Sequence, residues 1–442
     1  MQVGDLQSRA TLRSNLVQKI GQTTLRIKEE IVAIETDVTW NPVFGKPRTA
    51  QFRDNGGLNR QNRAGFQWWT LLLGVLTLAS RLIFTSSPYF VDGPRHVYFV
   101  EHGQIFVSSP PGYFLFGETA KIISDLLNVS AATAISIMNV SFSSCGAIIF
   151  ANLATRLIPG ILGILLAFCY AFSDTVWFVS DIHSTYAAMT FFVPAVLYAI
   201  CIDESGGLTG VLWAAMTGFR PSDGVFLLPF VLFAVGRRGM RHVSIFAIAA
   251  LPVLAVWYIP TARHFGGGLL SPLTAAGGQA HHVANGLFVN EPWQRKVSNL
   301  VHIAFGSFNA WNILTPFLFI GCFSRATWTR AALLCITPGL LFFTFYFFSD
   351  STYYAYLVAP GLLLAGVGLQ QLPPRYGMTV TFLALALSIG QMTIARPLQS
   401  RTAAAAVMNA YCLKYSGWGI RNRYDPRLRD TLEIIHERKT DR

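Results

Sequence analysis

The sequence predicts an all-α, polytopic membrane protein with about eleven transmembrane helices. Of its 442 residues, 52% are hydrophobic and only 13% are charged, and its mean hydropathy is +0.43. A soluble domain normally has about 25% charged residues, so the composition argues against a soluble enzyme with a large core. The apolar runs are about 17–22 residues long, which suits helical spans. They lack the alternating pattern, roughly ten residues per strand, that is typical of a membrane β-barrel.

Two polar tails flank the apolar part of the chain. Residues 1–65 carry ten Lys/Arg against six Asp/Glu, which predicts a cytoplasmic tail, and the spacing of its apolar residues suggests an amphipathic helix. The first apolar run begins near Phe66, too late for a cleavable signal peptide, and is interpreted as a retained helix. Residues 396–442 form a basic C-terminal tail. Basic residues concentrated in tails indicate a membrane surface, and no nucleic-acid partner is expected.

The predicted membrane domain, residues 66–395, consists of apolar runs separated by polar segments. The first span, 66–84, is followed by a long first extracytoplasmic loop, 85–127, and then by ten further spans: 131–153, 160–178, 186–202, 208–219, 225–235, 243–261, 297–319, 331–348, 354–369 and 378–394. An odd number of spans puts the basic C-terminal tail outside. Either that tail binds anionic lipid or glycan phosphate there, or the span count is wrong by one.

The short runs 208–219 and 225–235 decide the topology. As a single helix they would carry Arg220, Pro221 and Asp223 at mid-membrane and leave the arginine cluster at 237–241 outside. As a hairpin they turn outward at 219–224 and keep that cluster inside. The hairpin satisfies the positive-inside rule and removes proline from a helix interior, so we expect the hairpin.

With this topology, ionisable residues collect at the outer face. The first loop contributes Asp92, which begins a helix-like stretch with His96 on the same face, and a rigid Ser-Ser-Pro-Pro-Gly-Tyr turn at 108–113. An amphipathic segment at 113–126 follows, which suits the membrane interface. A carboxylate held under such a segment suits general-base chemistry. The alternative is that Asp92 only caps an interfacial helix and Pro-Pro only ends a loop.

Several motifs resemble one known superfamily. They are FVDGPRHVYFVEHGQIFVSSPPGYFLFGETAKII in the first loop, Met138-Asn139-Val140, AFSDTVWFVSDIHSTYAAMTFF and Gly218-Phe219-Arg220-Pro221-Ser222. Over residues 66–260 the chain resembles the GT-C integral-membrane glycosyltransferases, most closely the bacterial branch related to protein O-mannosyltransferases. It differs where that branch has Glu after Asp-x-Gly, His before Pro-Pro and a later Glu. The corresponding regions here hold Arg95-His96, Ser109 and Asp181-to-His183.

The resemblance implies a reaction and a set of roles. Enzymes of this superfamily transfer a sugar from a polyprenyl-phosphate donor to an acceptor on the outer face, and an inverting single displacement is expected here. Asp92, which matches the loop aspartate, would be the base that accepts the acceptor's proton. Arg220 would hold the leaving phosphate, since a guanidinium grips phosphate bidentately. Further substrate-binding residues are expected among Arg95, His96, Asp181, His183, His264 and Asp350.

Each of these residues has a structural alternative. Arg220 suits a snorkelling interfacial arginine, His183 a hydrogen-bonded helix-end histidine, and the 350–354 segment an aromatic belt. His281-His282 lacks a further ligand at metal spacing, so a divalent metal is not favoured, and the loop at 263–299 suits a gating segment.

The expected partners are a polyprenyl-phosphate sugar, a glycan, lipid or protein acceptor, and membrane lipids. The expected location is a bacterial inner or plasma membrane, with the active site outside. Two other functions stay open: a lipid-carrier flippase or transporter, and a non-catalytic scaffold derived from this superfamily. Transporters keep charged residues at mid-membrane and often have internal repeats, and the sequence displays neither pattern.

Overall fold

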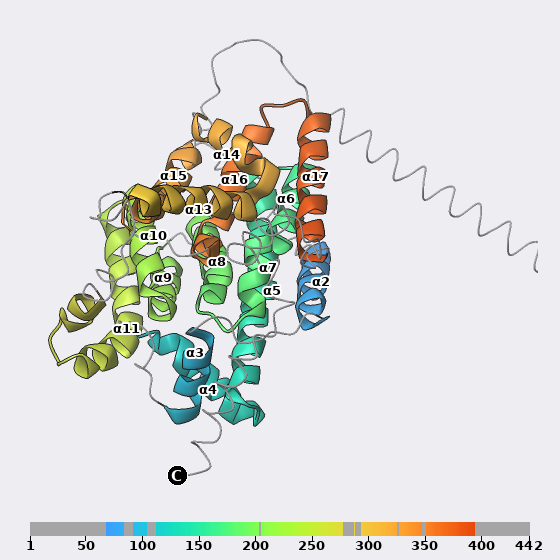
Figure 1. The fold of residues 1–442 in the computed structure, drawn as a ribbon. Helices are drawn as coiled ribbons and strands as arrows, with labels where there is room; N and C mark the ends of the chain where they lie inside the picture. The colour runs from blue at the N-terminus through green and yellow to red at the C-terminus, as the bar shows by residue number, and fades with distance from the viewer. Residues whose placement is uncertain are drawn as a thin grey trace, which may run out of the picture. The chain divides into compact units, whose positions relative to one another are not determined.

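The computed structural model describes residues 68–83, 92–103, 112–202, 205–276, 287, 293–324, 327–346 and 351–393. Within these ranges every regular element is a helix, which confirms the all-α prediction (Figure 1). The two predicted tails, 1–65 and 396–442, lie outside the described residues.

The helices follow the predicted spans closely. The helices of the first half are α2 (Trp68–Ile83), α3 (Asp92–His102), α4 (Phe114–Leu127), α5 (Ala131–Leu157), α6 (Ile161–Ala171), α7 (Asp174–Asp181), α8 (Tyr186–Ile202), α9 (Gly207–Phe219) and α10 (Pro221–Gly236). Those of the second half are α11 (Met240–His264), α13 (Trp293–Trp311), η2 (Asn312–Leu314), α14 (Thr315–Cys322), α15 (Thr327–Phe345), η3 (Ser351–Tyr356), α16 (Val358–Leu369) and α17 (Pro374–Thr393).

Four of the described helical stretches are long and apolar enough to cross a membrane: Ala131–Leu157, Ile161–Asp181, Met240–His264 and Asn299–Cys322. Shorter apolar helices accompany them, including α2, α8, α9 and α10. Large apolar side chains stay exposed along α2, α11 and α17, for example Leu72, Leu251 and Phe382. Such faces would be costly in water and suit contact with lipid.

Two predicted spans are interrupted. The span predicted at 160–178 divides into α6 and α7, and Arg81 of α2 donates from Nη2 to the carbonyl oxygen of Ala171, at the break. The span predicted at 297–319 divides at η2, where Asn312 adopts a positive φ of 39°. The Asn312 side chain donates to the carbonyl oxygen of Ala384 at 2.9 Å and to Ser388 Oγ at 2.8 Å, both on α17. At both breaks, a side chain forms hydrogen bonds with a helix that is distant in the sequence.

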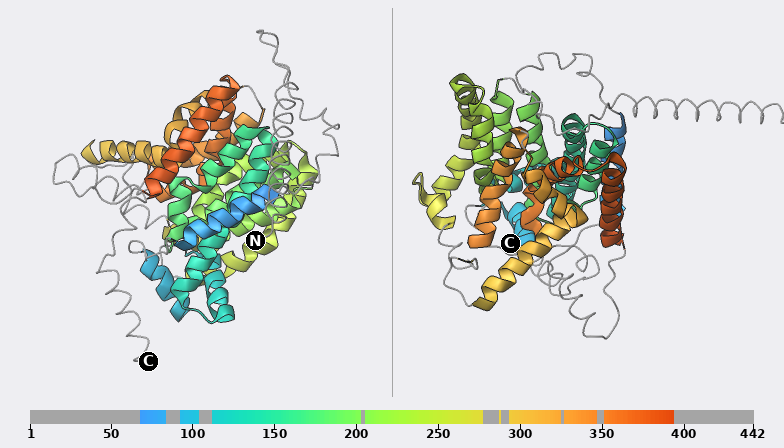
Figure 2. Two further views of the ribbon diagram at one scale, coloured as in Figure 1. Left: turned by 90° about the vertical axis from the view of Figure 1, so that its right-hand side faces the viewer. Right: turned by 90° about the horizontal axis from the view of Figure 1, so that it is seen from above.

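Close helix packing depends on glycines. A Cβ at Gly146 of α5 would lie 1.9 Å from the carbonyl oxygen of Thr190 in α8. Gly321 and Gly368 likewise allow close contact between the backbones of α14 and α16, because a Cβ added at either glycine would lie 2.0 Å from a backbone oxygen of the other helix. Figure 2 shows α2 lying along α5, an arrangement that the contacts between these two helices support.

The helices α9 and α10 form a hairpin, as predicted. Trp213 donates from Nε1 to the carbonyl oxygen of Gly224 at 2.9 Å. In a straight helix these two residues would be separated by about 16 Å along the axis, so the chain must fold back between them. Arg220 connects the helices in an extended conformation, with a φ of −152°. The alternative of a single helix is therefore excluded.

Candidate functional site

Several segments that are distant in sequence meet around Arg220. They are the middle of α3, the start of α4, the loop between α7 and α8, the turn between α9 and α10, and η3. Arg220 is the turn residue of the hairpin, and only 4% of its surface is exposed. All these segments belong to the face that the sequence predicts to be extracytoplasmic.

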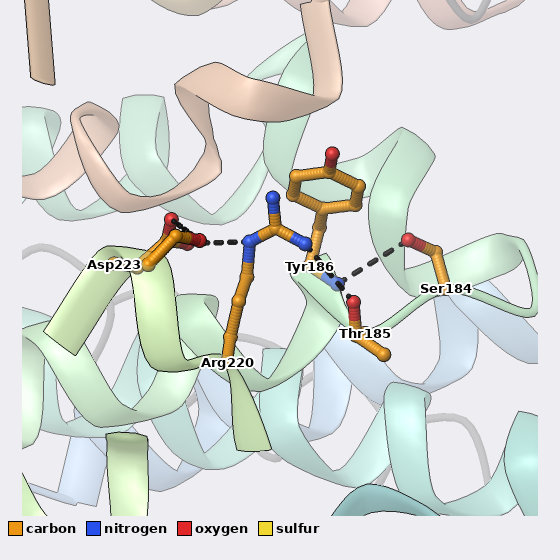
Figure 3. A network of polar contacts seen from close by, with 6 residues as sticks. Ser184, Thr185, Tyr186, Arg220 and Asp223 are labelled. Carbon is orange, nitrogen blue, oxygen red and sulfur yellow. Dashed lines mark hydrogen bonds and ion pairs between the residues drawn. The ribbon is translucent and has the colours of Figure 1, made fainter. Parts of the chain in front are cut away.

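The guanidinium of Arg220 has fixed partners on two edges (Figure 3). Its Nε lies 2.8 Å from Asp223 Oδ2, and its Nη1 donates to Thr185 Oγ1 at 3.2 Å. The Tyr186 ring centroid lies 3.6 Å from its central carbon, as expected for a stacked cation–π pair. The rings of Tyr353 and Tyr113 lie farther out, at 5.5 and 5.9 Å.

This environment keeps Arg220 charged. Burial works to lower the pKa of Arg220, but Asp223 and then the three tyrosines raise that pKa well above its ordinary value. The remaining nitrogen, Nη2, has no hydrogen bond to a described residue, and it points away from Asp223 and Thr185 (Figure 3). A charged group with one donor edge left open can bind an anion.

The loop from Ile182 to Thr185 is held by helix α5. Asn139 donates from Nδ2 to the carbonyl oxygens of Ile182 and Ser184, at 2.7 and 3.1 Å. The Ser184 hydroxyl in turn accepts a hydrogen bond from the Tyr186 backbone N–H at 3.2 Å, at the start of α8 (Figure 3). Asn139 therefore fixes the loop that presents Thr185 to Arg220.

His183, in the same loop, is buried and neutral at pH 7. Burial lowers the pKa of His183 to about 4. Its Nε2 lies 3.1 Å from Ser136 Oγ. The Ser136 hydroxyl also lies 3.0 Å from the carbonyl oxygen of Ala132, within its own helix.

His96 of α3 is the second buried histidine at the site. Its ring packs against Tyr113 and Phe116, with centroids 5.8 and 5.1 Å away. Burial, followed by electrostatic repulsion from His183, Arg220 and Arg95, lowers the pKa of His96 to about 3. Its Nδ1 is buried and has no hydrogen-bond partner in the described part of the chain. A neutral histidine cannot neutralise a phosphate, but it can orient a hydroxyl.

The other predicted site residues are spread more widely. Arg95 is exposed on α3, and Asp181 is buried at the end of α7, directly before the loop. His264 is exposed at the end of α11, with its ring against Phe265. Asp92 is the first residue of α3, but its side chain lies outside the described part, as does Asp350 altogether. The structure thus brings together His96, His183 and Arg220.

Several residues at the site were not predicted as site residues. Asp223 pairs with Arg220 at a spacing of i to i+3, a pattern visible in the sequence. Asn139 is an amide in an apolar span, which is also a visible signal. Arg81 is 1% exposed, donates to Ser180 Oγ at 3.1 Å, and lies 4.6 Å from the Trp177 ring. Arg81 therefore holds α7 in place directly before the 182–185 loop. No local pattern in the sequence predicts this contact.

Among the residues that the structure describes, no group of three or more His, Cys, Asp or Glu side chains could hold a metal ion. The His281-His282 pair lies outside those residues.

Comparisons of the chain with protein-family models, with curated proteins and with solved structures found no match.

Proposed function

We propose that this chain is a multi-pass membrane glycosyltransferase of the inverting type. It would transfer a sugar from a polyprenyl-phosphate donor to an acceptor hydroxyl at the extracytoplasmic face of a bacterial inner or plasma membrane. The observation that carries the proposal is the buried, charged Arg220, which is fixed on two edges and has Nη2 open. The motif resemblance over residues 66–260 supplies the reaction class.

Arg220 suits the leaving group of this reaction. When the bond between the sugar C1 and the phosphate oxygen breaks, that oxygen keeps the electron pair and the polyprenyl phosphate gains a negative charge. A preorganised cation stabilises such developing charge without reorganising at the moment of reaction. Asp223 and Thr185 hold the guanidinium in place, and Nη2 is the donor that would meet the phosphate.

Asp92 is the proposed base. It stands one helical turn before His96 in α3, and residues four apart share a helix face. The acceptor hydroxyl attacks C1, and its proton passes to the Asp92 carboxylate. His96, neutral and with Nδ1 open, would orient that hydroxyl. A single displacement of this kind inverts the configuration at C1.

Arg220 also suits two functions other than transfer. A purely structural ion pair explains its contact with Asp223, but leaves the open Nη2 without a role. A lipid-carrier flippase would use the same phosphate contact without any base. Sugar transfer and lipid counterflow therefore have to be measured on the same preparation.

The experiment uses the purified full chain in liposomes that contain a panel of radiolabelled hexosyl and pentosyl polyprenyl phosphates. We expect release of polyprenyl phosphate with transfer of the sugar, and we expect the rate to fall by at least 100-fold in Asp92→Asn, as for loss of a general base. Arg220→Lys keeps the charge, loses the planar fork and should weaken binding of polyprenyl phosphate, measured by thermal shift.

The matched control is Arg263→Gln, an exposed arginine on α11. Transfer at the parent rate in Asp92→Asn would exclude it as the base, and counterflow without transfer would favour a flippase.

A further inference from the structure

Exposed arginines lie close together around the C-terminal end of α8, the end that is far from Arg220. Helix α8 begins at Tyr186, against Arg220, and its 17 residues extend about 25 Å to Ile202. Around that far end lie the end of α5, the end of α10 and the start of α11. They supply four arginines, all exposed: Arg156, Arg237, Arg238 and Arg241.

Two of these arginines converge on the last turn of α8. The Arg156 guanidinium lies 4.9 Å from the centroid of the Tyr198 ring. Arg238 donates from Nη2 to the carbonyl oxygen of Ile200. The positive fields of both reach the exposed thiol of Cys201, so these charges from α5 and from the end of α10 act at one place.

Arg241 belongs to the same place through the packing of α9. A Cβ at Gly206 would lie 3.0 Å from the carbonyl oxygen of His242 and 3.5 Å from Val235 Cγ1. The end of α10 and the start of α11 therefore meet at the start of α9. Arg237 and Arg241 stand on either side of this junction.

Only one of the four arginines in this cluster has a hydrogen bond or ion pair within the described part of the chain. Arg238 caps the carbonyl end of α8, which is an ordinary structural role. Arg156, Arg237 and Arg241 have no hydrogen bond or ion pair within the described part of the chain. Asp203 and Glu204, which follow α8, lie outside the described residues, and the four arginines exceed these two carboxylates by two positive charges, an excess that suits an anion.

Exposed aliphatic side chains border the arginines. Ile202, Leu208 and Met240 are 41%, 47% and 76% exposed, and they stand at the end of α8, the start of α9 and the start of α11. A phospholipid has the same arrangement, with a phosphate at the surface and acyl chains beneath it. Free phosphate would satisfy the arginines but leave this apolar border uncovered.

We propose that Arg156, Arg237, Arg238 and Arg241 bind the phosphate headgroup of an anionic phospholipid, at the membrane face opposite the Arg220 site. Guanidinium groups suit this ligand because they grip phosphate bidentately and can lie against aromatic rings such as Tyr198. The site needs insertion in a bilayer but not the transferase reaction, so failure of sugar transfer would leave it intact.

The experiment compares the full chain in nanodiscs of phosphatidylcholine with and without phosphatidylglycerol. Cys201 reports on the site, and its rate of maleimide labelling is followed by peptide mass spectrometry. We expect phosphatidylglycerol to slow labelling at least threefold in the parent. The ratio of rates should return to about one when Arg156, Arg237 and Arg241 are all replaced by Gln. Taking the ratio within each variant cancels any direct effect of the arginines on the thiol.

The matched control is Arg375→Gln, an exposed arginine packed on Tyr376 at the start of α17. This variant should keep the parent ratio, because its arginine lies outside the cluster. Equal protection in the triple variant, equal protection by inorganic phosphate, or an equal loss in Arg375→Gln would overturn the proposal. If the triple variant fails to fold, Arg241→Gln alone is used, and it should reduce the protection at least partly.

Discussion

The Nε atom of Arg220 lies 2.8 Å from Oδ2 of Asp223, and both side chains are less than 5% exposed. The pair spans the turn at which α9 ends and α10 begins. Each partner offsets part of the cost of burying the other's charge, so removal of one charge alone leaves the other buried without compensation.

Replacing Asp223 by Asn should destabilise the protein by about 3–5 kcal/mol, because it leaves the Arg220 cation buried without a counter-ion. Thermal unfolding of the purified chain in detergent measures the change. The double variant Arg220→Met with Asp223→Leu should recover at least half of the lost stability, while losing any binding of polyprenyl phosphate. A double variant as unstable as Asp223→Asn would show that the two charges are not coupled.

Asn139 should be sensitive to the exchange of its amide for a carboxyl group. In Asn139→Asp the two donated hydrogen bonds to Ile182 and Ser184 are lost, and the buried carboxyl faces two carbonyl oxygens. We expect a loss of at least 2–3 kcal/mol, on the order of two unsatisfied buried acceptors.

The matched control is Asn152→Asp in the same helix. Among the described residues, the one acceptor of Asn152 Nδ2 is the carbonyl oxygen of Ile148, at 2.8 Å within the same helix. That variant should lose about 1 kcal/mol or less, as for one partly exposed hydrogen bond. If both variants unfold at the same temperature, the loop does not depend on Asn139.

The sequence predicts the helices better than it predicts their breaks. The span predicted at 186–202 coincides with α8, because polar residues bound the apolar run on both sides. The hairpin was predictable from Pro221 and the arginine cluster after it. The break between α6 and α7 was not, because it depends on Arg81, which is 90 residues from Ala171 along the chain.

The candidate site follows the same division. Arg220, His96 and His183 carry local signals, namely ionisable side chains beside apolar runs. The tyrosine rings around Arg220 come from α8, η3 and the start of α4, and tyrosines at membrane interfaces are too common to single out. Asp92 as the base and Asp350 as a substrate residue stay predictions.

The stability of the fold should depend on pH through His96. Its folded pKa of about 3 lies below the value near 6.5 for an unfolded histidine, so the neutral form is favoured by folding. Its contribution is fully present above pH 6.5 and is lost as the pH falls from there toward 3. The slope in this window should be up to about 1.4 kcal/mol per pH unit. His96→Phe keeps the ring contacts with Tyr113 and Phe116 and should reduce the slope between pH 4 and 7 to the part that His183, with its folded pKa of about 4, contributes, as measured by unfolding. His264→Gln, at an exposed position, is the control, and an unchanged curve in His96→Phe would contradict the assignment.

Gly146 should tolerate no side chain, because its contact is with backbone. An alanine Cβ would lie 1.9 Å from the carbonyl oxygen of Thr190, and a backbone atom cannot move aside as a side-chain tip can. We expect Gly146→Ala to cost at least 1–3 kcal/mol through overpacking between α5 and α8.

Gly236→Ala is the matched control, since that glycine ends α10 with nothing within 4 Å of an added Cβ. It should be neutral or stabilising by up to about 1 kcal/mol. Equal unfolding temperatures for the two variants would mean that α5 and α8 are not in backbone contact at Gly146.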